Sequence, residues 1–493
     1  MLTKKDLRLL QENGISEISA TEQIELLQKN DSYLLLVAPA TPDKGITIVK
    51  DTEYFINTFE KEYLNHKICK FVPASGAATR MFKRLISFNQ EASENNFVEG
   101  GFYSVHSSFN QLQKFAFFET LQNQIKQNKD YQYLSEKILF SGLGYAEIPK
   151  GLIEFHKYPN GSRTAFEEHL HEAAKLCKDN GKIDIHLTVS PEFKEDFENN
   201  LIKIREKTGL KLNVDFSIQE KSTDTLALYD DESPARDSEG NLLLRPGGHG
   251  ALLKNLNRID ADIIFIKNID NLTHGDYLED TLPYKKLLGG MLIDIIQKNT
   301  QIFKNISSEE FSLHIDNAKK YLEERLGADF SQTKNLREEI LRFINRPVRV
   351  CGMVKNTGEP GGGPFWVLNA YNTITLQIVE KAQVNLSLAD QKDKFMSATH
   401  FNPVDLVCYT KSLDGKRFDL NNFVDKNACF ISEKTHLGKN IRVLEHPGLW
   451  NGAMANWLTV FVEVPLITFN PVKELNDLLR KEHQPKEEFW KAT

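Results

Sequence analysis

The chain has 493 residues, a length that suits two to four domains or one enlarged α/β domain. Its 61 Lys and Arg residues against 68 Asp and Glu residues give a formal net charge of −7, which argues against a nucleic-acid partner. The chain is 40% hydrophobic and 26% charged, so its composition is that of a globular protein and excludes an intrinsically disordered one.

Residues 1–70 are predicted to form an N-terminal helical extension. Apolar residues recur at three- and four-residue spacing in KKDLRLLQEN and TEQIELLQKN, and the pair Asn13-Gly14 separates the two helices. The first residues lack the apolar core of a signal peptide, and the run Tyr33–Ala40 is too short to span a bilayer. We therefore expect a cytoplasmic protein with no membrane partner.

The following segment, 71–410, is predicted to be an α/β core. KFVPASGAATRMFKRL reads as strand, turn and helix, and the segment 145–285 alternates strands such as KIDIHLTVS with amphipathic helices. Such alternation predicts a mainly parallel central sheet covered by helices on both faces. Helix-like stretches at about 86–140 and 290–345 are expected to be insertions, and 411–493 is expected to add strands and a helical tail after Pro471.

Two anion-binding features are expected in the first half of the chain. The turn PASGAATRM has small residues between a strand and a helix, so its backbone N–H groups can approach an anion and Arg80 can bind phosphate oxygens. Neither a P-loop nor a Rossmann glycine pattern is present, and a turn built for packing explains the small residues equally well. Lys150, in a Pro-Lys-Gly turn, is by itself typical of a surface charge.

Metal-ligand patterns are sparse. The five cysteines are scattered without C-x-x-C spacing, which favours buried reduced thiols over a zinc site. His169, His171 and Glu172 lack the H-E-x-x-H spacing, and we expect them to lie on an exposed helix face. Asp270 follows the apolar strand 263–266, and a carboxylate at such a strand end can hold Mg²⁺ or cap the next helix.

Glycine-rich loops mark three later positions. LRPGGHGALL precedes a helix, and its glycines suit either close approach of a ligand or a tight turn. A second glycine-rich loop comes before the strand that ends at Glu380, and a third contains Trp450 and Asn451. Tryptophan and asparagine in such a loop suit recognition of a sugar or base, and both are also common in packed turns.

The order of these segments resembles the nucleotidyltransferases that make nucleotide sugars, above all the UDP-sugar pyrophosphorylases, including UDP-N-acetylglucosamine pyrophosphorylase. The matching strings, in chain order, are SGAATRM at 75–81, PKGL at 149–152, the glutamine strand FSIQ at 216–219, PGGHG at 246–250, IDN at 269–271, IVE at 378–380 and TFNPVK at 468–473. The likeness covers roughly 70–84 and 145–475, and it implies a nucleotidyltransferase, GT-A-like or Rossmann-like fold.

The resemblance also implies an activity and a phosphate site. The expected reaction joins a nucleoside triphosphate, UTP in the first instance, and a sugar 1-phosphate into a nucleotide sugar and pyrophosphate, with Mg²⁺ as cofactor. The residues that would hold the β- and γ-phosphates are Ser75, Gly76, Ala77, Thr79 and Arg80. Arg80, Lys150 and Lys473 would be the catalytic cations, with Lys150 at the α-phosphate and Lys473 at the sugar phosphate.

The remaining roles concern the metal, the base and the sugar. Asp270 would bind Mg²⁺, and Asn402 and Asp405 are candidates for the second ligand, of which Asp405 is preferred. The residues that would read the base are Gln219, Gly247, Gly248 and Gly250, and those that would contact the sugar are Glu380 and Asn451.

The chain departs from this pattern and leaves other functions open. Ser75 and Ala78 replace loop glycines of the family, and His249 stands where the family often has Asn or Asp. A non-catalytic nucleotide or nucleotide-sugar binding protein is therefore an alternative, as are a GT-A-type glycosyltransferase, for which Asn268-Ile269-Asp270 is close to D-x-D, and a scaffold protein. The whole chain also resembles an uncharacterised bacterial family catalogued as a domain of unknown function, through strings such as PASGAATRMFK and PGLWNGAMANW.

Overall fold

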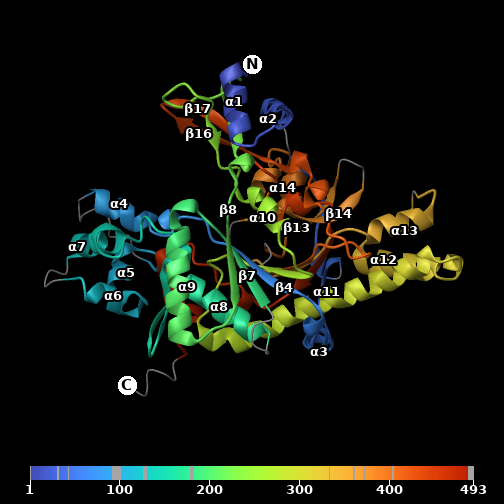
Figure 1. Ribbon diagram of the computed structural model, residues 1–493, viewed down its shortest axis with the longest axis horizontal. Coiled ribbons are helices and arrows are strands. Elements are labelled where there is room, and N and C mark those ends of the chain that lie inside the picture. The colour runs from blue at the N-terminus through green and yellow to red at the C-terminus, as the bar shows by residue number, and fades with distance from the viewer. Residues whose placement is uncertain are drawn as a thin grey trace. The chain divides into compact units, whose positions relative to one another are not determined.

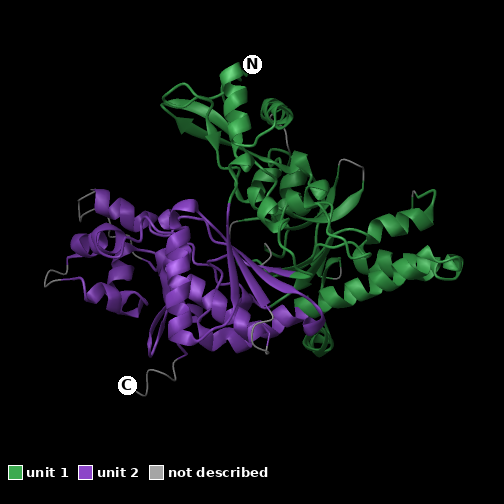
Figure 2. Cartoon of the chain, in the orientation of Figure 1, with its two compact units in different colours: residues 1–62, 219–263, 288–464 green, residues 63–218, 264–287, 465–493 purple. Residues whose placement is uncertain are grey.

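A computed structural model of the chain describes the residues 2–29, 33–42, 44–91, 101–125, 130–177, 183–331, 333–358, 361–369, 373–401 and 405–486. The chain divides into two compact units, and each is assembled from three separate segments (Figure 2). Unit 1 comprises 1–62, 219–263 and 288–464, and unit 2 comprises 63–218, 264–287 and 465–493. In the part of the chain that the structure describes, no helix is both long enough and apolar enough to cross a bilayer.

Unit 2 is built around a parallel sheet. Its strands follow the order β11 (Ile263–Ile266), β4 (Ile68–Pro73), β7 (Ile183–Val189) and β8 (Asn213–Ile218), and β11 begins one residue before the unit. The pairs β4–β7 and β7–β8 are parallel, with Ile68 opposite Ile183 and Asp184 opposite Asn213. All four residues of β11 are buried, as its continuous apolar run predicts.

Helices cover this sheet. Phe166 of α8 (Ala165–Leu176), Phe197 of α9 (Lys194–Thr208) and Phe216 of β8 form an aromatic cluster, which joins the two helices to the sheet edge (Figure 1). The described part of unit 2 also contains the hairpin β5 (Glu154–Tyr158) and β6 (Gly161–Thr164), and the short helices α4 (Lys83–Glu91), α5 (Val105–Asn110), α6 (Phe118–Gln122) and α7 (Tyr131–Glu136). These short helices occupy the insertion expected at 86–140.

Unit 1 also has a mostly parallel sheet. Its strands follow the order β2 (Thr41–Pro42), β3 (Gly45–Thr47), β18 (Leu458–Glu463), β12 (Val348–Met353) and β15 (Asp405–Tyr409), and β12–β15 is its antiparallel pair. Two antiparallel sheets accompany it. One is β1 (Leu35–Pro39), β13 (Gly363–Leu368) and β14 (Ile374–Val379), and the other is β10 (Leu244–Arg245), β9 (Thr225–Tyr229), β17 (Lys439–Glu445) and β16 (Phe430–His436).

The helices of unit 1 include the predicted N-terminal pair. Leu10 of α1 (Lys4–Glu12) and Leu27 of α2 (Glu17–Lys29) are buried in one core with Leu226 and Leu228 of β9, so this pair packs on the second antiparallel sheet. The others are α3 (Thr52–Glu62), α10 (Leu253–Leu256), α12 (Ile315–Leu326), α13 (Leu336–Ile344) and α14 (Ala389–Met396), and α11 (Leu278–Ser307) begins in unit 2 and ends in unit 1.

The structure confirms the predicted fold class, since both units are α/β with mostly parallel sheets and helices around them. One detail differs. The tail after Pro471 forms two short 3₁₀ turns, Leu475–Leu479 and Lys481–His483, instead of a continuous α-helix. The five cysteines are all buried and unbridged, as expected. The three-segment division at 71 and 411 stays a prediction.

Candidate functional site

The turn after β4 presents one face to solvent. Gly76, Thr79 and Arg80 are exposed, whereas Ala78 is fully buried, so the methyl group that replaces a family glycine points into the protein. A Cβ atom on Gly76 would meet nothing within 4 Å. Arg80 forms no hydrogen bond or ion pair within the described residues, and its five donors are available to an anion.

A short backbone bridge ties this turn to Lys150. Ala77 lies opposite Pro149, and Ala78 donates its N–H to the carbonyl of Ile148 at 3.4 Å. The next glycine, Gly151, is required by packing, because a Cβ atom there would lie 2.7 Å from the ring of Phe197. The Pro-Lys-Gly string therefore fixes the position of Lys150 beside the turn.

Lys150 is held by two acceptors. Its Nζ donates to Oδ2 of Asp270 at 2.8 Å and to the carbonyl oxygen of Val472 at 2.7 Å. The side chains of Lys150 and Asp270 are 12% and 20% exposed. An ammonium group has three N–H donors, so one donor of Lys150 remains available for a ligand.

The segment that contains Lys473 joins the same cluster. Val472 donates its N–H to the carbonyl of Asp270 at 3.0 Å, and Asn271 accepts the N–H of Asn470 at 2.7 Å on Oδ1. Leu475 donates its N–H to the carbonyl of Met81, which closes the loop back onto the turn. Four predicted segments, at 75–81, 149–152, 269–271 and 468–473, thus meet in unit 2, and the side chain of Lys473 is exposed there.

Unit 2 also contains a buried ion cluster that the sequence did not predict. Glu172 is 2% exposed, and its carboxylate binds Lys70 and Lys267, both at 2.7 Å, with Lys285 at 3.4 Å. Burial alone would raise the pKa of Glu172, but the three ammonium groups outweigh it and hold that pKa well below its usual range.

The expectation of an exposed helix face at His169, His171 and Glu172 is therefore wrong. His169 is completely buried, and its Nε2 lies 3.2 Å from the carbonyl oxygen of Ile269, one residue before Asp270. Of the three side chains, His171 retains partial exposure, at 17%. This face of α8 is buried against lysines from other parts of the chain, which neutralise Glu172. Residue spacing within the helix cannot reveal partners that are distant in sequence.

A second buried network fixes the tail of unit 2. His156 lies between Glu168 and His483, with Nδ1 2.9 Å from the carboxylate and Nε2 2.9 Å from Nδ1 of His483. The other nitrogen of His483 is 3.1 Å from the carbonyl oxygen of Asn470. Burial lowers the pKa of His483 well below its usual value, so this imidazole is neutral and structural.

In unit 1 the PGGHG loop packs against the chain segment that precedes Trp450. A Cβ atom on Gly247 would lie 2.4 Å from the carbonyl oxygen of Thr223, and one on Gly250 would lie 2.2 Å from that of Pro447. Gly248 has a φ of +73° and also lies close to Glu445. The glycines thus permit close contact between two stretches of this chain, an explanation different from both of those expected from the sequence.

Three more predicted positions meet beside this loop. Asn451 donates from Nδ2 to Oε1 of Glu380 at 2.8 Å, and Nε2 of His249 lies 3.8 Å from the same oxygen. The ring of His249 packs on Trp450 with centroids 5.0 Å apart, and its Nδ1 accepts the N–H of Leu449, which leaves the proton on Nε2. Partial burial lowers the pKa of His249 despite the opposing charge of Glu380.

Two predicted positions take no part in the clusters described above, and one lies outside the described residues. Gln219 follows β8 directly, and its side chain makes no hydrogen bond within the described part of the chain. Asp405 begins β15, where it is 4% exposed and lies opposite Gly352 of β12. Asn402 lies outside the described residues.

The donor set at Asp270 fits Mg²⁺ bound with a phosphate ligand. Among the described residues no group of three or more His, Cys, Asp or Glu side chains is arranged to hold a metal by itself. Mg²⁺ is commonly held by one or two carboxylates together with substrate phosphates, and the partly exposed carboxylate of Asp270 meets that requirement.

Comparison with solved structures supports the predicted resemblance. The chain aligns with a uridine diphosphate N-acetylglucosamine pyrophosphorylase from Trypanosoma brucei over 97% of this chain and 79% of that one, with 11% identity and a TM-score of 0.51. A mutant UDP-glucose pyrophosphorylase from Leishmania major aligns over 97% and 79%, with 13% identity and a TM-score of 0.45. A putative UDP-N-acetylglucosamine pyrophosphorylase from Entamoeba histolytica aligns over 89% and 84%, with 12% identity and a TM-score of 0.44.

At these identities the likeness concerns the fold, and the resemblance drawn from the sequence motifs is confirmed at that level. A comparison with curated proteins gives no match. One family profile spans residues 3–484, almost the whole chain. The chain therefore belongs to the family described as a domain of unknown function, DUF4301.

Proposed function

We propose that the chain is a nucleotidyltransferase that forms a nucleotide sugar and pyrophosphate from a nucleoside triphosphate, in the first instance UTP, and a sugar 1-phosphate. The observation that carries this proposal is the meeting of four separate segments in unit 2 around Lys150 and Asp270. Each segment matches one motif of the resemblance, and a match of sequence motifs does not by itself bring the segments into contact.

The proposed reaction is a displacement at phosphorus. A phosphate oxygen of the sugar 1-phosphate attacks the α-phosphorus, the bond from that phosphorus to the bridging oxygen breaks, and pyrophosphate leaves with the electron pair. Such a reaction needs positioning and neutralisation of charge more than covalent help from the protein. Arg80 and the N–H groups of Ser75, Gly76, Ala77 and Thr79 hold the β- and γ-phosphates, and Lys473 binds the sugar phosphate.

Lys150 is suited to the α-phosphate because its ammonium group is already oriented. Two of its donors are held at 2.7 and 2.8 Å, so the third points in a fixed direction when the substrate arrives. A donor fixed in advance stabilises developing charge without reorganisation during the reaction. Asp270 thereby has a second role as the residue that positions Lys150.

Magnesium belongs to this proposal as the expected cofactor. Asp270 would hold it together with phosphate oxygens of the substrate, and bound there it would neutralise phosphate charge.

The loops of unit 1 are assigned to the organic parts of the substrates. The proposal gives Gln219 and Gly247–Gly250 to the base, and Glu380 and Asn451 to the sugar hydroxyls. Asp405 remains the candidate for a second metal ligand.

The test is a substrate panel. Purified protein is incubated with each common nucleoside triphosphate and a set of sugar 1-phosphates, with Mg²⁺ or with a chelator, and pyrophosphate release is measured. We expect one pair, with UTP, to give pyrophosphate and the matching nucleotide sugar, and the chelator to abolish both. Calorimetry with each nucleotide runs in parallel.

The outcomes separate the competing functions. Tight nucleotide binding without turnover of any pair would favour a non-catalytic binding protein. Transfer or hydrolysis of a nucleotide sugar without pyrophosphate chemistry would favour a glycosyltransferase. Absence of both turnover and nucleotide binding would contradict the proposal and leave the scaffold reading.

A further inference from the structure

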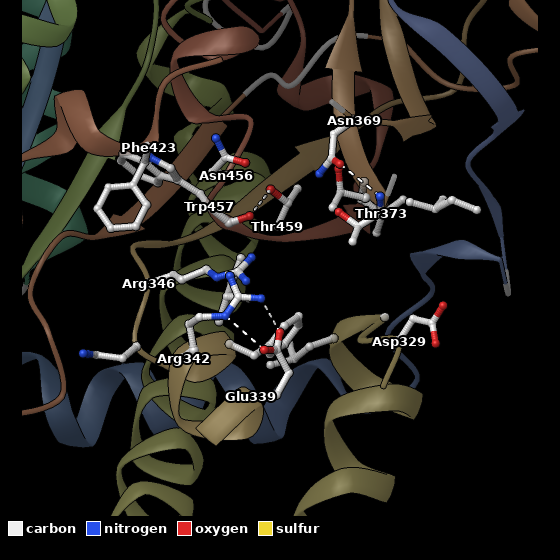
Figure 3. A pocket seen from close by; sticks show the side chains of 18 of the residues that line it. Asp329, Glu339, Arg342, Arg346, Asn369, Thr373, Phe423, Asn456, Trp457 and Thr459 are labelled. Carbon is white, nitrogen blue, oxygen red and sulfur yellow. Dashed lines mark hydrogen bonds and ion pairs between the residues drawn. The ribbon is translucent and has the colours of Figure 1, made fainter. Parts of the chain in front are cut away.

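Unit 1 contains a cavity that the proposed reaction does not use. It has a volume of about 380 Å³, within the range of small-molecule sites, and none of the residues assigned above lines it. Its walls come from the end of α12, from α13, from the neighbouring ends of β13 and β14, and from the segments at 422–423 and 456–459 (Figure 3). Aromatic side chains form much of the lining, namely Phe330, Phe343, Trp366, Phe423 and Trp457.

Two arginines line this cavity. Arg342 belongs to α13, which ends at Ile344, and Arg346 follows in the segment after the helix. Figure 3 shows their guanidinium groups side by side. Arg342 is paired with Glu339, with Nε donating to Oε2 at 3.0 Å. Arg346 stacks over the ring of Phe343, 5.1 Å from its centroid, and has no hydrogen-bond acceptor among the described residues.

Among the described residues, Arg346 therefore forms no ion pair or hydrogen bond through its guanidinium group. Partial burial lowers its pKa, and the adjacent charge of Arg342 lowers it further, against the opposing effect of Glu339. Five guanidinium donors without an acceptor in a partly dry site are unfavourable unless a ligand supplies one. The other carboxylate at the cavity, Asp329, lies across it from the arginines in Figure 3 and accepts the N–H of Ser331 at 2.9 Å.

A second donor in the lining also lacks an acceptor. Trp457 is 4% exposed, and its indole Nε1 is buried without a hydrogen-bond partner in the described part of the chain. Asn456, beside it, contributes a half-buried amide to the same wall. The cavity thus combines a cationic end, unused hydrogen-bond donors and aromatic faces.

We infer that this cavity binds a small organic phosphate, with the phosphate on Arg346 and Arg342 and a ring or other apolar body against the aromatic side chains. Arginine pairs with phosphate oxygens through two parallel hydrogen bonds, and a dianion matches two neighbouring guanidinium groups. Trp366 and the other aromatic rings of the lining provide the flat surfaces for the organic part. The inference does not depend on which reaction the chain carries out.

Three probes test both halves of the site. Phenyl phosphate carries the anion and the ring, inorganic phosphate carries the anion alone, and benzyl alcohol carries the ring alone. Binding is followed by calorimetry and by tryptophan fluorescence, because two tryptophans line the cavity. We expect phenyl phosphate to bind with a Kd of about 1 mM or tighter and at least roughly 10-fold better than either of the other probes.

Matched variants locate the binding. Arg346→Gln is expected to weaken phenyl phosphate binding by roughly 10-fold or more, and Arg346→Lys by less. Arg342→Gln offers a second test that spares the fold, because that side chain is 69% exposed. Arg325→Gln, on the exposed side of α12 and outside the lining, is the control and should bind as the wild type does.

Three results would overturn the inference: no binding of phenyl phosphate, binding that Arg346→Gln and Arg342→Gln leave unchanged, or equal binding of benzyl alcohol. The loss expected in the arginine variants, with full binding in Arg325→Gln, would support it. Nucleotide turnover measured on the same samples does not test this cavity, because no residue assigned to the proposed reaction lines it.

Discussion

The predicted residues in the two units are held in place by different physics. In unit 2 the residues are held mainly by charge. Lys150 donates to Asp270 and to a carbonyl oxygen, and Glu172 forms ion pairs with three lysines. In unit 1 the residues are held mainly by close packing, since glycines allow two loops to touch, and a hydrogen bond joins the amide of Asn451 to Glu380. The first arrangement suits phosphate, and the second suits the uncharged hydroxyl and amide groups of a sugar or base.

The largest effect on stability is expected at the buried carboxylate of unit 2. Glu172→Ala leaves three buried ammonium groups without their shared counterion, and we expect the free energy of unfolding to fall by roughly 3–5 kcal/mol in urea titrations. The matched change Glu324→Ala removes an exposed partner of Lys320, at 68% exposure, and should change stability by less than about 0.5 kcal/mol. Equal effects of the two changes would contradict the charge-based account of unit 2.

The next effect concerns activity at the charged cluster. Asp270→Ala and Arg80→Ala should each lower pyrophosphate release by roughly 100-fold or more, because each removes a group that neutralises or positions phosphate. Circular dichroism should show a retained fold in both. Arg8→Ala, at an exposed position of α1, is the arginine control and should retain full activity. Turnover retained by either site variant would refute the assigned roles.

Glycine substitutions compare the two units directly. In Gly250→Ala the new Cβ atom would lie 2.2 Å from a carbonyl oxygen, so the loops must separate, and we expect a loss of about 2 kcal/mol in the free energy of unfolding. Gly76→Ala has open space and a φ outside the left-handed region, so its stability should change by less than about 0.5 kcal/mol. Thermal and urea unfolding check both variants. A large loss in the free energy of unfolding of Gly76→Ala would contradict the difference proposed between the two loops.

The last prediction is a pH dependence at Lys70, which is spread over several pH units. Burial lowers the pKa of Lys70 to about 8 from an ordinary value of 10.5, although Glu172 opposes the shift. Between these values the unfolded chain binds more protons than the folded one, so this group makes stability rise with pH, by up to about 1.4 kcal/mol per pH unit. Lys70→Met removes that rise, and urea titrations at several pH values should diverge from the wild type in that window. Parallel curves would contradict the assignment.

The sequence predicts the fold through patterns that are local. Strand and helix alternation from 145 to 285 and the apolar run Ile263–Ile266 both depend on neighbouring residues, and both are confirmed. The same holds for the helix pair divided at Gly14, where φ is +72°. In the tail after Pro471 the pattern is too short to separate an α-helix from 3₁₀ turns, because tertiary contacts decide between them.

The candidate site is only partly accessible to sequence reasoning. Motif order assigns Lys150, Asp270 and Lys473 to one site, and the three segments that contain them are in contact, while the roles of these residues stay predictions. It gave no sign that Glu172 is buried, because the three lysines around it are distant in sequence and a charged helix face normally lies in solvent. The same limit applies to Arg346, because the absence of an acceptor for it among the described residues depends on the folded cavity.

The interleaved segments of the two units bear on how the protein is made. A ribosome releases residues 63–218 long before 465–486, yet the latter supply the carbonyl that holds Lys150 and the imidazole that completes the His156 network. Unit 2 therefore cannot finish folding while its last segment is still inside the exit tunnel. Until that segment emerges, Lys150 lacks one of its two acceptors and the site lacks Lys473, and a product truncated before residue 465 lacks both.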